Sequence, residues 1–206
     1  MVHEESVNPA TRGDLAALIK SGILKGFYLA GGTGLALHFG HRESFDLDFF
    51  CENNFNEDQK LAAISSIGNY SLEKKETGTL TGNFQNTMLS FFYYPYPLLE
   101  SSTMWDEIEI ASVIDIACMK LDAAATRGSK KDFIDLYMII RTGGYTLHDL
   151  LTAFEKKYEK VEYNLMHIKK SLVYFPDADA DVMPIMHTHI DWNEVKAFFE
   201  QEVLKL

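Results

Sequence analysis

Two aspartates, spaced two residues apart, are the side chains in this sequence best suited to chemistry. Asp46 and Asp48 alternate with Phe45, Leu47 and Phe49, a pattern typical of a half-buried β-strand. Both carboxylates would then point to one face of the strand, where together they could hold a divalent cation such as Mg²⁺ or Mn²⁺. A solvated pair without chemical function is the alternative, but charged groups on so apolar a strand are costly without a partner.

Two glycines precede this pair. Residues 27–30 form a short apolar run, predicted to be a buried strand that stops at Gly31 and Gly32. A helix is predicted to follow, with Thr33 as its N-cap and Gly40 at its end. Glycine lets a phosphate approach the backbone closely, and a helix N-terminus favours an anion. A Gly-Gly pair before a helix is common by itself, but together with the two acids it indicates metal-dependent phosphoryl transfer.

The bulk composition sets the class of protein. The chain has 206 residues, with 47% hydrophobic and 24% charged, which indicates one globular domain or one compact two-lobed unit. Its net charge of −11 argues against broad nonspecific binding of nucleic acid. The sequence contains no apolar run long enough for a membrane helix and no secretory signal. We therefore expect a cytoplasmic protein, without membrane association, whose Cys51 and Cys118 are reduced thiols.

The order of the expected elements predicts an α+β fold. Residues 57–67 are predicted to form a helix, and residues 70–96 two or three strands with Gly78 and Gly82 at the turns. A short strand is expected at 108–110. The rest is predicted to be helical, at about 113–127, 130–141, 146–158, 163–174 and 192–205. We therefore expect an α+β lobe at 1–112 and a helical lobe, packed against it, at 113–206.

The predicted helical lobe contains a second polar group of residues. Lys120 lies on an apolar helix, where it could either extend to solvent or enter a site. Arg127, Lys130 and Lys131 surround an interhelical turn that could bind RNA phosphates, or could be only a solvated junction. Asp132 could instead stabilise the first turn of the helix that follows.

Two segments of the chain resemble a known family. They are GGTGLALHFGHRESFDLDFF at 31–50, and DIACMKL at 115–121 followed by Arg127 and by KKDFIDLY at 130–137. The chain resembles the AbiEii-like nucleotidyltransferases, the toxin half of bacterial toxin–antitoxin and abortive-infection systems. Their fold is a minimal polymerase-β-like nucleotidyltransferase lobe, a mixed sheet with flanking helices, and the resemblance implies the same lobe here.

The resemblance also implies roles for individual residues. The residues that would bind the nucleotide phosphates are Gly31, Gly32, Thr33, Arg42, Ser44 and Lys120. The catalytic residues would be Asp46, Asp48, Lys120 and Asp132, with Asp46 and Asp48 as the metal ligands. The wider superfamily has a third metal-site carboxylate on a later strand, but residues 88–94 contain none. Asp132 or Glu109 could complete the site, or two acids could suffice.

We therefore expect transfer of a nucleoside monophosphate from an NTP to an acceptor, with Mg²⁺ or Mn²⁺ as the cofactor. By resemblance, the acceptor is RNA such as a tRNA 3′ end, or else a protein side chain, and the partner is a cognate antitoxin. One alternative is a noncatalytic nucleotide-binding regulatory or interaction module. Another is a structural protein in which Asp46 and Asp48 pair with Arg42 and Lys120.

Overall fold

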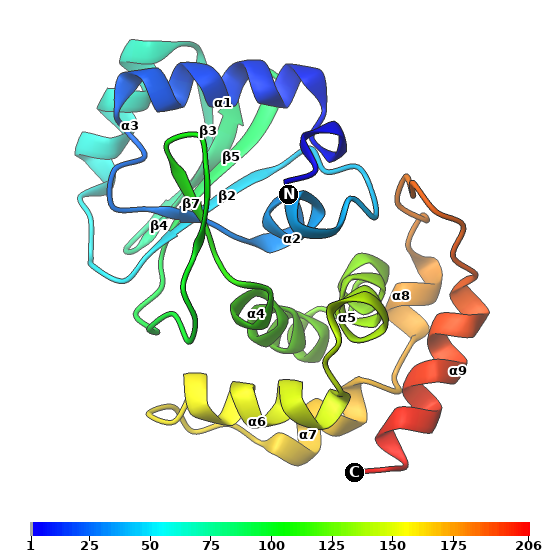
Figure 1. Cartoon of the computed structure of the whole chain (residues 1–206). Helices are drawn as coiled ribbons and strands as arrows, with labels where there is room; N and C mark the ends of the chain where they lie inside the picture. The colour runs from blue at the N-terminus through cyan, green and yellow to red at the C-terminus, as the bar shows by residue number, and fades with distance from the viewer. Residues whose placement is uncertain (1) are drawn as a thin grey trace. The chain divides into compact units, whose positions relative to one another are not determined.

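The chain divides into two compact units in the computed structural model, which describes residues 2–206. The first unit runs to Pro97 and includes Ser101–Ala111, and the second consists of Leu98–Glu100 and Ser112–Leu206. The short stretch 98–100 belongs to the second unit because the backbone N–H groups of Leu99 and Glu100 donate to the carboxylate of Asp115. The chain can be followed by colour in Figure 1.

The first unit is built on one mixed sheet of seven strands. The strands are β1 (Tyr28–Leu29), β2 (Leu47–Cys51), β3 (Tyr70–Glu76), β4 (Thr79–Phe84), β5 (Thr87–Tyr93), β6 (Thr103–Trp105) and β7 (Ile108–Ile110). Their order is β3-β4-β5-β2-β1-β7-β6. The β1–β7 and β2–β5 pairs are parallel, and the remaining pairs are antiparallel. The predicted mixed sheet is therefore confirmed.

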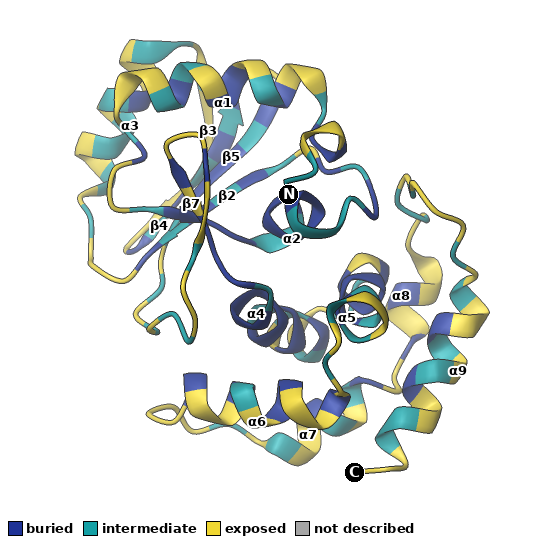
Figure 2. Cartoon of the chain, in the orientation of Figure 1, coloured by how far each residue is buried: buried dark blue, intermediate teal, exposed yellow. Residues whose placement is uncertain are grey.

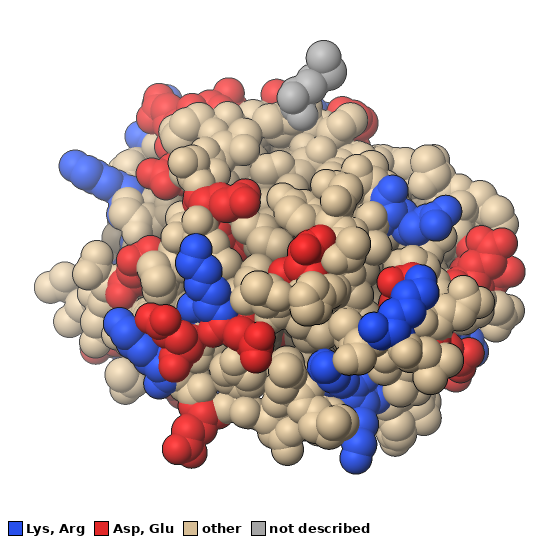
Figure 3. Space-filling model, turned by 60° about the horizontal axis from the view of Figure 1, so that its bottom comes forward, with Lys and Arg blue, Asp and Glu red and all other residues tan. Residues whose placement is uncertain are grey.

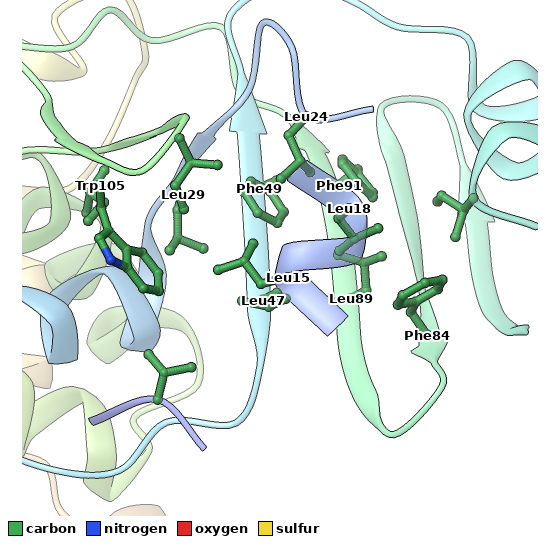
Figure 4. Close-up of a cluster of buried hydrophobic side chains, with 14 of the residues drawn as sticks. Leu15, Leu18, Leu24, Leu29, Leu47, Phe49, Phe84, Leu89, Phe91 and Trp105 are labelled. Carbon is green, nitrogen blue, oxygen red and sulfur yellow. The ribbon is translucent and has the colours of Figure 1, made fainter. Parts of the chain in front are cut away.

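Helices flank this sheet, and its core lies on one face. The helical elements are η1 (Glu4–Ser6), α1 (Pro9–Ser21), α2 (Gly31–Phe39) and α3 (Glu57–Ile67). Leu15 and Leu18 of α1 belong to the same buried cluster as Leu47, Phe49 and Phe91 of the sheet (Figure 4). Because side chains alternate along a strand, Asp48 and Phe50 lie on the opposite face of β2 from this cluster.

The second unit is helical. It contains α4 (Val113–Thr126), α5 (Lys130–Gly143), α6 (Leu147–Lys157), α7 (Leu165–Ser171), α8 (Pro176–Ala180) and α9 (Trp192–Val203). Figure 2 shows α4 as mostly buried, whereas α6 and α9 carry exposed stripes. The central position of α4 explains its composition, since eight of its residues, including Lys120, are buried. No helix within residues 2–206 is both long and apolar enough to cross a membrane.

Most predicted elements are present, but one turn was predicted wrongly. Gly78 does lie between β3 and β4, with φ of 74°. Gly82 lies inside β4 instead, and the next turn contains Gln85, with φ of 54°. A Cβ atom at Gly82 would come within 2.4 Å of the backbone oxygen of Ser71 on β3. Glycine is therefore required there by strand pairing. The short elements β6 and α8 were missed because so few residues show no clear periodicity.

We predict opposite effects of alanine at two glycines. Gly82→Ala should destabilise the protein by roughly 1–3 kcal/mol, because its methyl group would clash with the β3 backbone. Gly13→Ala should stabilise it by roughly 0.5–1 kcal/mol, because Gly13 is exposed inside α1 and its Cβ would meet nothing within 4 Å. Urea denaturation measures both changes. Equal effects of the two substitutions would contradict the proposed close approach at Gly82.

Candidate active site

The carboxylate of Asp48 lies against the first turn of α2. The Ala30 N–H donates to the Asp48 carbonyl at 3.1 Å, which ties the start of α2 to β2. Gly31 then takes a left-handed φ of 64°, and a Cβ atom there would be 3.0 Å from Asp48 Oδ2. Glycine is required at this position both for its conformation and for the space that the carboxylate fills.

A guanidinium lies beside the same turn. A Cβ atom at Gly32 would be only 2.4 Å from Nη2 of Arg42. The side chain of Arg42 is buried, and its Nη1 donates to the Glu43 carbonyl at 3.0 Å. The first N–H groups of a helix have no acceptor within the helix and carry a partial positive charge. Together with Arg42 they make this turn suitable for a phosphate group.

Thr33 connects this turn to the residues before β2. It is not the predicted N-cap, because Ala30 occupies that position without a side-chain hydrogen bond. The Thr33 hydroxyl instead donates to the Asp46 carbonyl and lies 2.7 Å from the Ser44 hydroxyl. Since its single proton goes to Asp46, Ser44 must be the donor to Thr33.

The same contacts change the prediction for Asp46. The predicted strand from Phe45 begins only at Leu47, so Asp46 lies just before β2 and only Asp48 lies within it. The Asp46 carbonyl accepts from Thr33 rather than from a neighbouring strand. The Ser44 N–H donates to the Ser6 carbonyl at 2.9 Å, which holds the approach to β2 in place. Both aspartates are half-buried.

The face of the sheet that carries Asp48 also carries a polar neighbour and a row of aromatic rings. In the register of β2 and β5, Asp48 is opposite Ser90, a site neighbour that sequence reasoning missed. Phe50, two residues further on, stacks with Tyr28 at 6.0 Å and with Phe92 at 5.1 Å between ring centroids. These stacked rings form a flat, largely apolar surface next to Asp48 on this face of the sheet.

The metal-ligating capacity of this site consists of two carboxylates. Among residues 2–206, no group of three or more His, Cys, Asp and Glu side chains could hold a metal ion. Glu109 is exposed on β7 and accepts from the Ser102 hydroxyl at 3.0 Å. Mg²⁺ in proteins is commonly held by one or two carboxylates together with substrate phosphates. Asp48, with Asp46 two residues before it in the chain, therefore offers ligands of the type that suits a cation arriving with a nucleotide.

Lys120 and Asp132 belong to the second unit, where they form a buried ionic cluster. Lys120 Nζ is 2.9 Å from Asp132 Oδ1 and 2.6 Å from Asp135 Oδ2. Asp132 also accepts from Nε and Nη2 of Arg127 and from the hydroxyl of Ser129. Sequence reasoning did not pair Asp135 with Lys120, although its spacing of three residues from Asp132 places both acids on one helical face.

The cluster fixes the charge of Asp132. Burial raises the pKa of this carboxyl, but Lys120, Arg127 and Ser129 outweigh burial and lower the pKa to about 2. Asp132 therefore remains an anion at neutral pH, and its oxygens orient Lys120 and Arg127. These contacts assign Asp132 a positioning role within the helical unit. They do not test the predicted catalytic roles of Asp132 and Lys120.

A family model and one relative each match most of the chain. The family model described as "Nucleotidyl transferase AbiEii toxin, Type IV TA system" matches residues 14–97 and 93–205. The uncharacterized protein aq_aa25 of Aquifex aeolicus (strain VF5) is 39% identical over 196 residues, which is 93% of each chain.

Two solved structures have a similar fold. JHP933 from Helicobacter pylori has a TM-score of 0.59 and 18% identity, covering 100% of this chain and 93% of its own. MenT4, the nucleotidyltransferase toxin Rv2826c from Mycobacterium tuberculosis H37Rv, has a TM-score of 0.51 and 12% identity, covering 97% and 86%. The fold predicted from the resemblance is thus confirmed.

We predict that Asp132 makes stability depend on acid pH. Its pKa is lowered from 3.8 to about 2 on folding, so its contribution is complete above pH 5 and is lost as the pH falls toward 2. The stability advantage of the wild type over Asp132→Asn should therefore shrink by about 2 kcal/mol across this range. Urea denaturation of both proteins at several pH values measures it. An advantage that does not change with pH would refute the lowered pKa.

Proposed function

Because the chain belongs to the AbiEii family of nucleotidyltransferase toxins, we propose that it moves a nucleoside monophosphate from an NTP to an acceptor hydroxyl. The observation that carries this proposal is the convergence of an acid, a glycine turn and a buried arginine. Asp48 lies against Gly31, and Arg42 lies against Gly32. The arrangement offers a metal-binding carboxylate beside a phosphate-binding helix N-terminus.

The triphosphate would lie along the first turn of α2. Its oxygens accept from the backbone N–H groups of this turn and from the Arg42 guanidinium, which is held beside Gly32. Thr33 and Ser44 keep the turn and the segment before β2 together through their hydroxyls. A preformed turn of this kind avoids reorganisation when the nucleotide binds, and positioning is the main source of rate in phosphoryl transfer.

Asp46 and Asp48 would hold Mg²⁺ or Mn²⁺ next to the α-phosphate. When bound, the cation supplies positive charge that activates the attacking hydroxyl and stabilises the departing pyrophosphate. The acceptor oxygen forms a bond to the α-phosphorus while the bond to the bridging oxygen of pyrophosphate breaks, and the hydroxyl proton passes to solvent. The close packing of Gly31 against Asp48 keeps this carboxylate in one position during transfer.

For the acceptor we propose RNA, with a tRNA 3′ end as the first candidate and a protein hydroxyl as the second. The support is the toxin family to which the chain belongs, which also makes a cognate antitoxin the expected partner. Cytoplasmic location and the catalytic roles of Lys120 and Asp132 stay predictions. Within the helical unit, Lys120 is paired with Asp132 and Asp135.

A noncatalytic nucleotide-binding module is the second candidate function. The observation in its favour is that Asp46 and Asp48 form no group of three metal ligands with any other described residue. In the purely structural alternative, the pairing of Asp46 and Asp48 with Lys120 has no support, because Lys120 pairs with Asp132 and Asp135 within the helical unit. The two remaining candidates differ in turnover, which the following experiment measures.

We predict that Asp48→Asn abolishes nucleotide transfer without unfolding the protein. Label from each α-³²P-NTP, supplied with Mg²⁺, should appear in one RNA or protein fraction with the wild type and should fall at least about 100-fold with Asp48→Asn. Asp58→Asn is the matched control, because Asp58 is an exposed acid of α3 whose ion pair with Lys75 is at the surface. Loss of label in both variants, or in neither, would contradict the assignment.

We further predict that metal and nucleotide bind together. MgATP or MgGTP should raise the melting temperature of the wild type, because binding to the native state stabilises it. Excess EDTA should remove the shift, Mn²⁺ should restore it, and Asp46→Ala/Asp48→Ala should show no shift. A shift with no label in any fraction would favour the noncatalytic module, whereas an equal shift in the double variant would place the metal elsewhere.

A further inference from the structure

An open pocket lies within the helical unit, at the end of α4 and alongside α7. Its volume is about 360 Å³. Its walls include small apolar side chains of α4, such as Ala124 and Ala125. The polar and aromatic residues that line it are Thr126, Arg127, His167, Lys170, Ser171, Tyr174 and Asp177. The pocket is therefore lined by two permanent cations, a histidine and an aromatic ring, with one carboxylate.

The cations of this pocket differ in how they are held. The ionic cluster fixes Arg127, because its Nε and Nη2 donate to Asp132 at 2.8 and 2.9 Å. Lys170 is exposed in the last turn of α7 and forms no ion pair with any residue between 2 and 206. The imidazole Nε2 of His167 is 3.1 Å from the Ala125 carbonyl, and this hydrogen bond ties α7 to α4. The pocket thus combines the guanidinium of Arg127, which Asp132 holds in place, with the ammonium of Lys170, which no ion pair within residues 2–206 holds in place.

The aromatic residue of the pocket is exposed to an unusual degree. Tyr174 is 59% exposed, although a tyrosine is ordinarily largely covered by its neighbours. It follows α7 closely, with its N–H bonded to the Ser171 carbonyl at 3.1 Å. Tyr174 therefore follows Lys170 by four residues and lines the pocket together with Ala124 and Ala125 of α4.

The basic residues around the interhelical turn, Arg127, Lys130 and Lys131, do not all belong to this pocket. Lys130 is buried, where it donates to Asp181 and lies 5.5 Å from the centroid of the Trp192 ring. It therefore joins α5 to the segments around α8 and α9. Of the three cations Arg127, Lys130 and Lys131, Arg127 alone lines the pocket. On the face drawn in Figure 3, basic side chains are interspersed with acidic ones rather than gathered into one patch. Anion binding on such a surface depends on local sites.

We propose that this pocket binds a single-stranded segment of the acceptor RNA. One phosphate contacts Arg127 and Lys170, and an unstacked base lies on the ring of Tyr174 against the apolar wall of α4. Phosphate contacts from Arg and Lys, together with base stacking on an exposed aromatic ring, are the usual means of binding single-stranded RNA. Asp177 supplies an acceptor for a ribose hydroxyl or a base amino group.

RNA fits this pocket better than an acidic protein segment. Carboxylates of a peptide would satisfy Arg127 and Lys170 but would leave the Tyr174 ring unused, and they offer no hydrogen-bond donor to Asp177. A nucleotide unit uses the cations, the ring and the carboxylate, because it joins an anionic phosphate to a flat base and to hydroxyl donors. The proposal rests on the proposed function only in naming the RNA as the acceptor, since the pocket would bind RNA without turnover.

Fluorescence anisotropy of the full chain with a short, unstructured RNA oligonucleotide tests the proposal, in EDTA and without NTP. Lys170→Gln should weaken binding and reduce the slope of log K against log salt by about 0.7, the value for one lost phosphate contact on a single strand. Tyr174→Ala should weaken binding by about tenfold without changing this slope. Lys160→Gln removes an exposed lysine that does not line the pocket and should change neither quantity.

Three results would overturn the proposal. One is wild-type protein that does not bind the oligonucleotide, and another is equal binding by the wild type, Lys170→Gln and Tyr174→Ala. The third is displacement of the RNA by a polyglutamate peptide of equal charge with no effect of Tyr174→Ala, which would identify an acidic protein segment as the occupant. Asp48→Asn should bind RNA like the wild type, because Asp48 does not line the pocket. If the wild type binds this RNA but transfers no nucleotide, the proposed function is refuted and the RNA-binding proposal stands.

Discussion

The close approach of the first turn of α2 to strand β2 is the contact on which the candidate active site depends. A hydrogen bond from Ala30 to the Asp48 backbone joins the two elements, and the glycines leave space that the side chains of Asp48 and Arg42 fill. A carboxylate and a guanidinium are thereby held at the N-terminus of one helix. A side chain at Gly31 would meet the Asp48 carboxylate and would have to adopt a left-handed conformation, and one at Gly32 would displace the end of the Arg42 side chain.

In the helical unit, buried charged side chains form ion pairs with one another. Asp115 and Lys157 are both fully buried and 2.7 Å apart, and the same carboxylate holds the N–H groups of Leu99 and Glu100. Lys120 is similarly enclosed by Asp132 and Asp135. Burial of ions is expensive, and pairs of this kind contribute less to net stability than to a defined arrangement. Their effect here is to fix one end of Arg127, which the proposed RNA pocket then uses.

Local patterns in the sequence predicted the elements well where periodicity and glycine signals agreed. The helix at 57–67 has the predicted bounds, and α2 ends at Gly40 with a left-handed φ of 63°. The prediction of a residue's role failed where that residue type is common in two different kinds of local structure. Thr33 resembles an N-cap, but its hydroxyl bonds to Ser44 and Asp46, eleven and thirteen residues away. Gly82 resembles a turn residue, but the backbone of β3 approaches it inside a strand.

The sequence by itself determined the alternation that buries Phe49 beside Asp48, the two glycines, and the family, because each depends on neighbours within a few residues or on motif order. Only the tertiary structure decided which groups meet. Strand register brought Ser90 opposite Asp48, and helix packing brought His167 to Ala125 beside Arg127. Such contacts join residues that lie tens of positions apart, and their geometry follows from how whole elements pack. No local period carries that information.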